Sequence, residues 1–242
     1  MIRDEAVCIR HWDWSETSQT VSLMTREHGI VRGVAKGAKR EKGGFSGGVE
    51  LLTRGEVQAR VKAPGTLATL TSWDLLETFP VLRSNLTAHR VSMHVADVAA
   101  GLFEEGDPHP RLHDALVDTL RRLQGGEAPG ACLVRFQWIA LGESGYRPEI
   151  DRDAASGEQL REARVYLFSP RHGGLTGQAS GAWKVRCETV ELLRLVAGGD
   201  EISGAPPDRT MRAARLLSSY ISEILGRELR SSAGVFGEAP RP

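Results

Sequence analysis

The sequence has little cysteine and carries no net charge. Its 242 residues contain three cysteines, Cys8, Cys132 and Cys187, and equal numbers of basic and acidic residues, 31 of each. Three widely spaced cysteines provide neither a disulfide framework nor a Cys-x-x-Cys metal pair. Zero net charge excludes a protein that is basic over its whole surface. We therefore expect buried thiols in a reducing compartment, and a nucleic-acid site only where positive charge is concentrated locally.

Long apolar runs are also missing. No window approaches the roughly 18 uninterrupted apolar residues of a membrane-spanning helix, and the first residues, MIRDEAVCIRHWDW, lack the apolar segment of a signal peptide. The sequence predicts a cytoplasmic protein without membrane contact. The chain is long enough for one large domain or two modest ones.

Positive charge is concentrated between Arg26 and Lys62, a stretch that contains nine Lys or Arg residues and only four acidic residues. At the centre is GVAKGAKREKGGFSGG, residues 33–48, with Lys36, Lys39, Arg40 and Lys42. Such a loop is typical of nucleic-acid binding, because each neutralised phosphate releases counterions. Strand positions nearby extend the positive surface: Arg26, Arg32, Arg60 and Lys62. A solubilising surface loop is the alternative, and charge alone does not decide between them.

The same stretch matches one enzyme motif completely and a second one only in part. Gly44 to Gly48 matches the G-x-S-x-G pattern around Ser46, but a nucleophile elbow needs a following helix, and we expect Val49–Leu52 to continue as a strand. A phosphate-binding loop starting at Gly33 would need its second glycine at Ala38. The sequence therefore predicts no catalytic residue, no enzyme activity and no cofactor.

The first eighty residues read as β structure. Short runs rich in β-branched or alternating residues, separated by turn signals, occupy 6–10, 20–24, 30–34, 56–61 and 67–70. Five such strands predict a small closed or partly open barrel, which suits single-stranded nucleic acid. Four aromatic residues can be either stacking faces or barrel core, and the sequence leaves this open: Trp12, Trp14, Phe45 and Trp73.

Helical spacing begins after Phe79-Pro80. Apolar residues recur with this period over 82–102, 112–123, 133–141, 190–196 and 211–225, and Gly226 is a plausible stop for the last helix. Residues 142–182 are irregular, and the tail from residue 231 reads as frayed. The prediction is an α+β protein with a barrel over 1–80 and a helical domain over 81–242, with a loop-rich insert at about 142–182.

Five segments of the chain are distinctive: SETSQTVSLMTREHG (15–29), GVAKGA (33–38), FSGGVELL (45–52), LVRF (133–136) and GYRPEID (145–151). Together they resemble the RecO family of bacterial recombination mediators. The resemblance implies an OB-fold barrel followed by a helical domain, and a nucleoid-associated function in DNA repair and homologous recombination. It implies binding of single- and double-stranded DNA, annealing of complementary strands, and help in loading RecA onto strands coated by single-strand-binding protein.

The resemblance also implies partners and DNA-binding residues. The partners are RecR and the C-terminal tail of single-strand-binding protein, and the residues are Lys36, Lys39 and Arg40, with Arg26 as an extension. By charge alone, Arg121, Arg122 and Arg135 are candidates for docking an acidic tail, or are solvated helix faces. The alternative function is an interaction scaffold of the same pathway with little DNA affinity.

One feature departs from the family. Many members carry a zinc ribbon in the insert, and the four positions equivalent to its cysteines are Asp153, Ser156, Gly177 and Ser180. Because four thiolates would hold the metal, we expect a degenerate, zinc-ribbon-like insert without zinc. Metal analysis of the purified protein checks this. We expect the insert to pack around Tyr146, Val165, Leu167 and Phe168.

Overall fold

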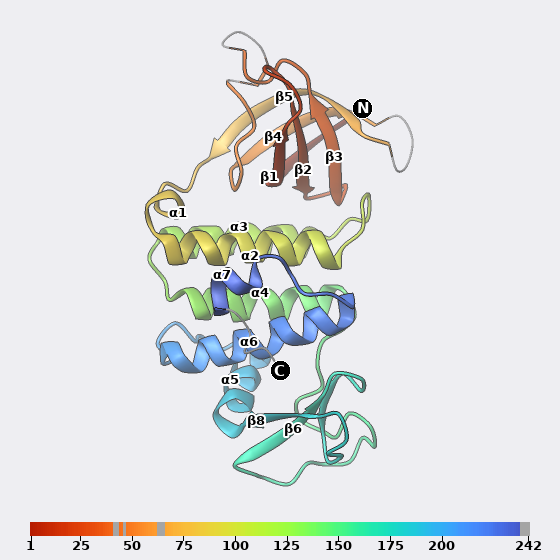
Figure 1. The fold of residues 1–242 in the computed structure, drawn as a ribbon, viewed down its shortest axis with the longest axis vertical. Coiled ribbons are helices and arrows are strands. Elements are labelled where there is room, and N and C mark those ends of the chain that lie inside the picture. Colours follow the sequence, from red (N-terminus) through yellow and green to blue (C-terminus); the bar gives the residue numbers. More distant parts are fainter. Residues whose placement is uncertain (41–43, 46, 62–65, 238–242) are drawn as a thin grey trace. The chain divides into compact units, whose positions relative to one another are not determined.

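The computed structural model describes residues 1–40, 44–45, 47–61 and 66–237. The chain divides into two compact units, Met1–Gly125 and Gly126–Pro242. Figure 1 shows the helices and strands of both units.

The first unit begins with a closed five-stranded barrel (Figure 1). Its strands are β1 (Ile2–Asp13), β2 (Gln19–Thr25), β3 (Ile30–Ala35), β4 (Arg54–Arg60) and β5 (Ala68–Glu77). They follow the order β1-β2-β3-β5-β4, and antiparallel pairing of β4 with β1 closes the barrel. Of the barrel pairings seen in the described part of the chain, only that of β3 with β5 is parallel. The predicted OB-like barrel is confirmed, and each of its strands pairs with a neighbouring strand on both sides.

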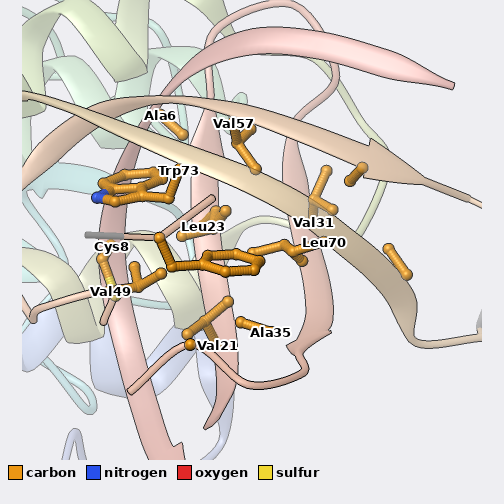
Figure 2. Packing of buried hydrophobic residues seen from close by; sticks show 14 residues of the cluster. Ala6, Cys8, Val21, Leu23, Val31, Ala35, Val49, Val57, Leu70 and Trp73 are labelled. Atoms are coloured by element: carbon orange, nitrogen blue, oxygen red, sulfur yellow. The ribbon is translucent and has the colours of Figure 1, made fainter. Parts of the chain in front are cut away.

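Alternate side chains of the strands fill the barrel. The core cluster includes Val21 and Leu23 from β2 and Val57 from β4, with Trp73 of β5 only 1% exposed among them (Figure 2). Cys8 is also in this cluster, and burial raises the pKa of its thiol to about 12. The expectation of buried thiols holds for Cys8 and Cys132 but is wrong for Cys187, which is half-buried.

Among its described residues, the first unit also contains three helices: α1 (Val81–Ser84), α2 (Leu86–Leu102) and α3 (Pro110–Gln124). The periodic pattern from residue 82 predicted one helix, but Asn85 divides it. Asn85 is extended, and its side chain accepts hydrogen bonds from the N–H groups of Thr87 and Ala88, which begins α2. Helices α2 and α3 both pack against β1.

The second unit contains four helices within the described residues and a small sheet. The helices are α4 (Pro129–Glu143), α5 (Cys187–Gly198), α6 (Pro207–Leu225) and α7 (Ser232–Phe236). Helix α6 ends at Gly226, which adopts the left-handed conformation at φ 62° and confirms the predicted stop. The tail was expected to be frayed, but α7 forms there.

The insert is more regular than the sequence indicated. It holds β6 (Val165–Ser169) and β7 (Gly174–Thr176), and β8 (Trp183–Arg186) follows directly after its predicted end. Strand β6 lies between β7 and β8, and both are antiparallel to it. Its packing also differs from expectation, since Tyr146 and Val165 are each 50% exposed. Phe168 is fully buried and contacts the rings of Trp183 and Tyr220. These strands are only three to five residues long, too short to give a clear alternating pattern in the sequence.

Asp153, one of the four positions expected to replace the cysteines of a zinc ribbon, connects two turns of the insert. One carboxylate oxygen accepts hydrogen bonds from the N–H groups of Ala155, at 2.8 Å, and Ser156, at 3.1 Å, and the other accepts from Gly177 at 2.5 Å. These N–H groups hold the pKa of Asp153 below its ordinary value. A carboxylate already surrounded by donors does not fit a zinc site, and the described residues contain no group of three potential metal ligands.

Candidate nucleic-acid interface

Three of the predicted cations lie on one turn that directly follows β3, here called the cationic turn (residues 36–40). Gly37 takes a left-handed conformation, φ 70°, and the N–H of Arg40 donates to the Gly37 carbonyl at 3.1 Å. This reversal brings Lys36, Lys39 and Arg40 onto one short segment, and all three are exposed. Within the described residues, no ion pair joins Lys36 or Arg40 to an acidic side chain.

The cationic turn is held in place by the turn between β1 and β2. The N–H of Lys39 donates to the Thr17 carbonyl at 3.1 Å, and the N–H of Gly37 donates to the Ser18 hydroxyl at 3.2 Å. Ala38, between them, is fully buried in the barrel core. A segment fixed in this way loses less conformational freedom when a ligand binds.

Lys39 has an acidic neighbour that the sequence reasoning missed. Its Nζ lies 2.7 Å from Oδ1 of Asp13, the last residue of β1. The hydrogen bond from Lys39 lowers the pKa of the Asp13 carboxyl. Both groups are solvent-accessible, so the pair is weak and can exchange partners. The only signal in the sequence was an acid beside the β1–β2 turn.

Arg26 and Arg32 lie away from the cationic turn. Arg26 follows β2 and precedes β3, whereas the cationic turn follows β3. The guanidinium of Arg26 donates to the carboxylate of Asp114 in α3 at 3.0 and 3.1 Å. Arg32, within β3, donates to Glu105 at 2.9 Å. Both cations are therefore engaged with the helical part of the first unit. Their role in DNA binding stays a prediction.

Lys42 and Ser46 lie outside the described residues. The expectation that Val49–Leu52 continues as a strand is wrong, because β4 begins only at Arg54. The N–H of Val49 donates to the side chain of Gln19 at 2.9 Å, and Leu52 has a left-handed φ of 57°, which interrupts a strand ladder. No helix follows in the described residues up to 61, so the context of a nucleophile elbow is not met.

The structure sorts the four candidate aromatic residues into two pairs. Phe45, 6% exposed, and Trp73, 1% exposed, belong to the barrel core. Trp12 is 48% exposed and Trp14 is 68% exposed. Only the second pair is accessible to a ligand.

Arginines proposed for docking an acidic tail each have an acidic partner. Arg121 binds Glu77 through two nitrogens, at 2.9 and 2.7 Å, and Arg122 bonds to Asp118 at 2.6 Å. Arg135 is paired with Glu127 and Glu201. These pairs favour structural roles, and the docking site stays unassigned. Within the described residues, no helix combines the length and hydropathy needed to cross a membrane.

Comparison with known proteins gives matches along nearly the whole chain. The family model described as Recombination protein O N terminal matches residues 1–79, and the one described as Recombination protein O C terminal matches residues 83–233. A DNA repair protein RecO from Myxococcus xanthus is 30% identical over 237 residues, 94% of each chain. One from a Nocardioides species is 31% identical over 246 residues, 97% of this chain and 99% of the relative.

Proposed function

Because this chain belongs to the RecO family of DNA repair proteins, we propose that it is a non-enzymatic recombination mediator that binds DNA through its barrel, residues 1–80. The observation that carries the proposal is the cationic turn, where three exposed cations stand on a segment tethered to the β1–β2 turn. Phosphates of single- or double-stranded DNA are the ligands that such a turn fits.

Annealing of complementary strands follows from the same chemistry. Two strands repel each other through their phosphates, and cations held on a fixed turn reduce that repulsion on the bound strand. We extend the proposal to the family's pathway: assistance in loading RecA onto strands coated by single-strand-binding protein, with RecR and the C-terminal tail of that protein as partners, in the cytoplasm at the nucleoid.

The salt dependence of binding tests the DNA site. The triple variant Lys36→Ala, Lys39→Ala and Arg40→Ala should bind a single-stranded oligonucleotide more weakly. The slope of log K against log salt should fall by about 2, because each lost phosphate contact removes about 0.7. The matched control removes three cations elsewhere in the first unit: Arg3→Ala, Arg90→Ala and Arg122→Ala. An unchanged slope in the first variant, or an equal loss in the control, would refute the proposed site.

The finer activities need a second assay. Strand annealing should be measured with and without single-strand-binding protein for the native chain, the turn variant and the control. We expect the turn variant alone to lose annealing of bare strands.

A scaffold with little DNA affinity is the second candidate. It is favoured by one observation, that Lys39, Arg26 and Arg32 already have acidic partners within the first unit. In that case the native chain would not shift single-stranded DNA at low salt, yet would still bind its partner proteins.

A further inference from the structure

Two tryptophans of the barrel are exposed to solvent. Trp12, near the end of β1, and Trp14, in the turn that follows, have 48% and 68% of their surface accessible, whereas Trp73 is 1% exposed. Single exposed apolar residues are ordinary. Trp12 and Trp14 stand one residue apart at the end of one strand, and each offers a large aromatic face to a ligand.

The tryptophans lie beside the cationic turn. Asp13, between them in sequence, binds the Lys39 amine at 2.7 Å. The N–H of Trp14 donates to the Ser18 carbonyl at 2.9 Å, and the neighbouring Thr17 carbonyl accepts from the N–H of Lys39. The aromatic and cationic groups are therefore held at the same end of the barrel by the same turn.

Strand register links Trp12 to positions on the outer side of the other barrel strands, where Thr20, Val34 and Thr69 are half-buried. One row of paired residues crosses all five strands: Trp12, Thr20, Val34, Thr69 and Arg60. The adjoining positions Val21, Ala35, Leu70 and Ala59 all belong to the core. Because side chains alternate along a strand, the row faces outward. It ends in exposed Arg60, so aromatic and cationic groups stand at its two ends.

We infer that Trp12 and Trp14 stack on unpaired bases of a single DNA strand whose phosphates are held by the cationic turn. This inference rests on the proposed function and adds the form of DNA that the site selects. In a duplex each base already stacks on its neighbours, so an indole reaches base faces freely only in an unpaired strand. Every base has such a face, so the selection is for single strands rather than for sequence.

Stacking also suits annealing. An indole covers the face of a base and leaves its Watson–Crick edge open. A strand bound in this way can pair with a complementary strand while its phosphates remain neutralised.

Three probes of equal phosphate number test the inference: an oligothymidylate, an abasic strand and a hairpin duplex. We expect the native chain to bind oligothymidylate at least about tenfold more tightly than the abasic strand, because each stacked base contributes a factor of about five to more than a hundred. Trp12→Ala with Trp14→Ala should remove most of this difference. The salt slope and the affinity for the duplex should change little.

Matched variants isolate the aromatic contribution. Trp12→Phe with Trp14→Phe should retain a measurable part of the preference, since phenylalanine still stacks. Leu75→Ala with Leu76→Ala removes two other exposed apolar side chains of the same barrel, 52% and 51% accessible, and should change nothing. Oligothymidylate, but not the abasic strand, should quench the native tryptophan fluorescence. That quenching should fall in the phenylalanine variant, which keeps the test valid if the alanine variant does not fold.

The outcomes separate this inference from the proposed function. It is overturned if the native chain binds oligothymidylate and the abasic strand equally. It is also overturned if the folded tryptophan variant loses a partner protein while keeping its full preference for bases. If the turn variant weakens binding and the tryptophan variant does not, only the stacking is wrong. If neither variant changes binding, the proposed DNA site fails as well.

Discussion

The barrel carries two groups of cations that the sequence does not distinguish. The helix-side arginines, Arg10, Arg26 and Arg32, each meet a carboxylate of the helical segment, namely Asp97, Asp114 and Glu105. In the cationic turn only Lys39 has an acidic partner among the described residues, and that partner is an exposed residue of β1. A positive residue of the barrel is therefore a candidate for DNA binding only when it is not already paired with an acidic side chain of the helical segment.

Acid should lower the stability of the helical part of the first unit, and we expect no comparable effect on the cationic turn. His94 of α2 is fully buried, and burial lowers its pKa to about 4 although Asp97 opposes the shift. The unfolded histidine, with a pKa near 6.5, binds a proton that the folded one excludes. Above about pH 6.5 this histidine therefore does not lower the free energy of unfolding. As the pH falls below that value the free energy of unfolding decreases, by about 3 kcal/mol at pH 4. The cationic turn, residues 36–40, contains no histidine.

Urea unfolding between pH 7 and pH 4 measures this effect. Carboxylates titrate in the same pH range. The informative quantity is therefore the difference in the free energy of unfolding between the native chain and His94→Gln. The variant should show a shallower loss of stability on acidification. Parallel curves for the two proteins would show that His94 is not protonated differentially.

The next largest effect is expected at the Arg10–Asp97 pair. The two side chains are joined at 2.8 Å, and the side chain of Asp97 is only 11% exposed while that of Arg10 is 36% exposed. Removing one partner of a fully buried pair costs about 3–5 kcal/mol. Because Arg10 keeps access to water, we expect Asp97→Asn to lower the free energy of unfolding by about 1–2 kcal/mol. Its salt slope for DNA binding should equal that of the native chain, and a changed slope would mean that the two groups of cations are coupled.

A smaller effect is expected for the exposed helix-side arginines. Arg26→Ala with Arg32→Ala removes two positive charges, as many as Lys36→Ala with Arg40→Ala removes from the cationic turn. If position rather than net charge matters, the first pair should change the salt slope by less than about 0.5 and the second by about 1.4. Equal slopes in the two double variants would remove the distinction between the two groups.

Much of the barrel was predictable because its strands alternate clearly and are separated by strong turn signals. The length of β5 was not predictable, because Ser72, Asp74 and Glu77 are polar residues typical of a loop. Their place in a strand follows only from the pairing of β5 with β4. The site was predictable only in part. Lys36, Lys39 and Arg40 are neighbours in sequence, so one turn brings them together. The partners of Arg26 and Arg32 come from residues more than seventy positions away, and no local pattern indicates them.

The smallest effect is expected from the acid beside the cationic turn, and its sign is opposite to the others. Asp13 pairs with Lys39 and keeps a low pKa because of that hydrogen bond. A phosphate that approaches Lys39 must replace this carboxylate and is repelled by it. Asp13→Asn should therefore strengthen binding of single-stranded DNA by about threefold at low salt and raise the salt slope by up to about 0.7. Asp74→Asn, on β5, is the control with the same charge change and should leave the slope unaltered. If Asp13→Asn weakened binding, Asp13 would instead be positioning Lys39 for phosphate, and the cationic turn would depend on its acidic neighbour as the helix-side arginines do.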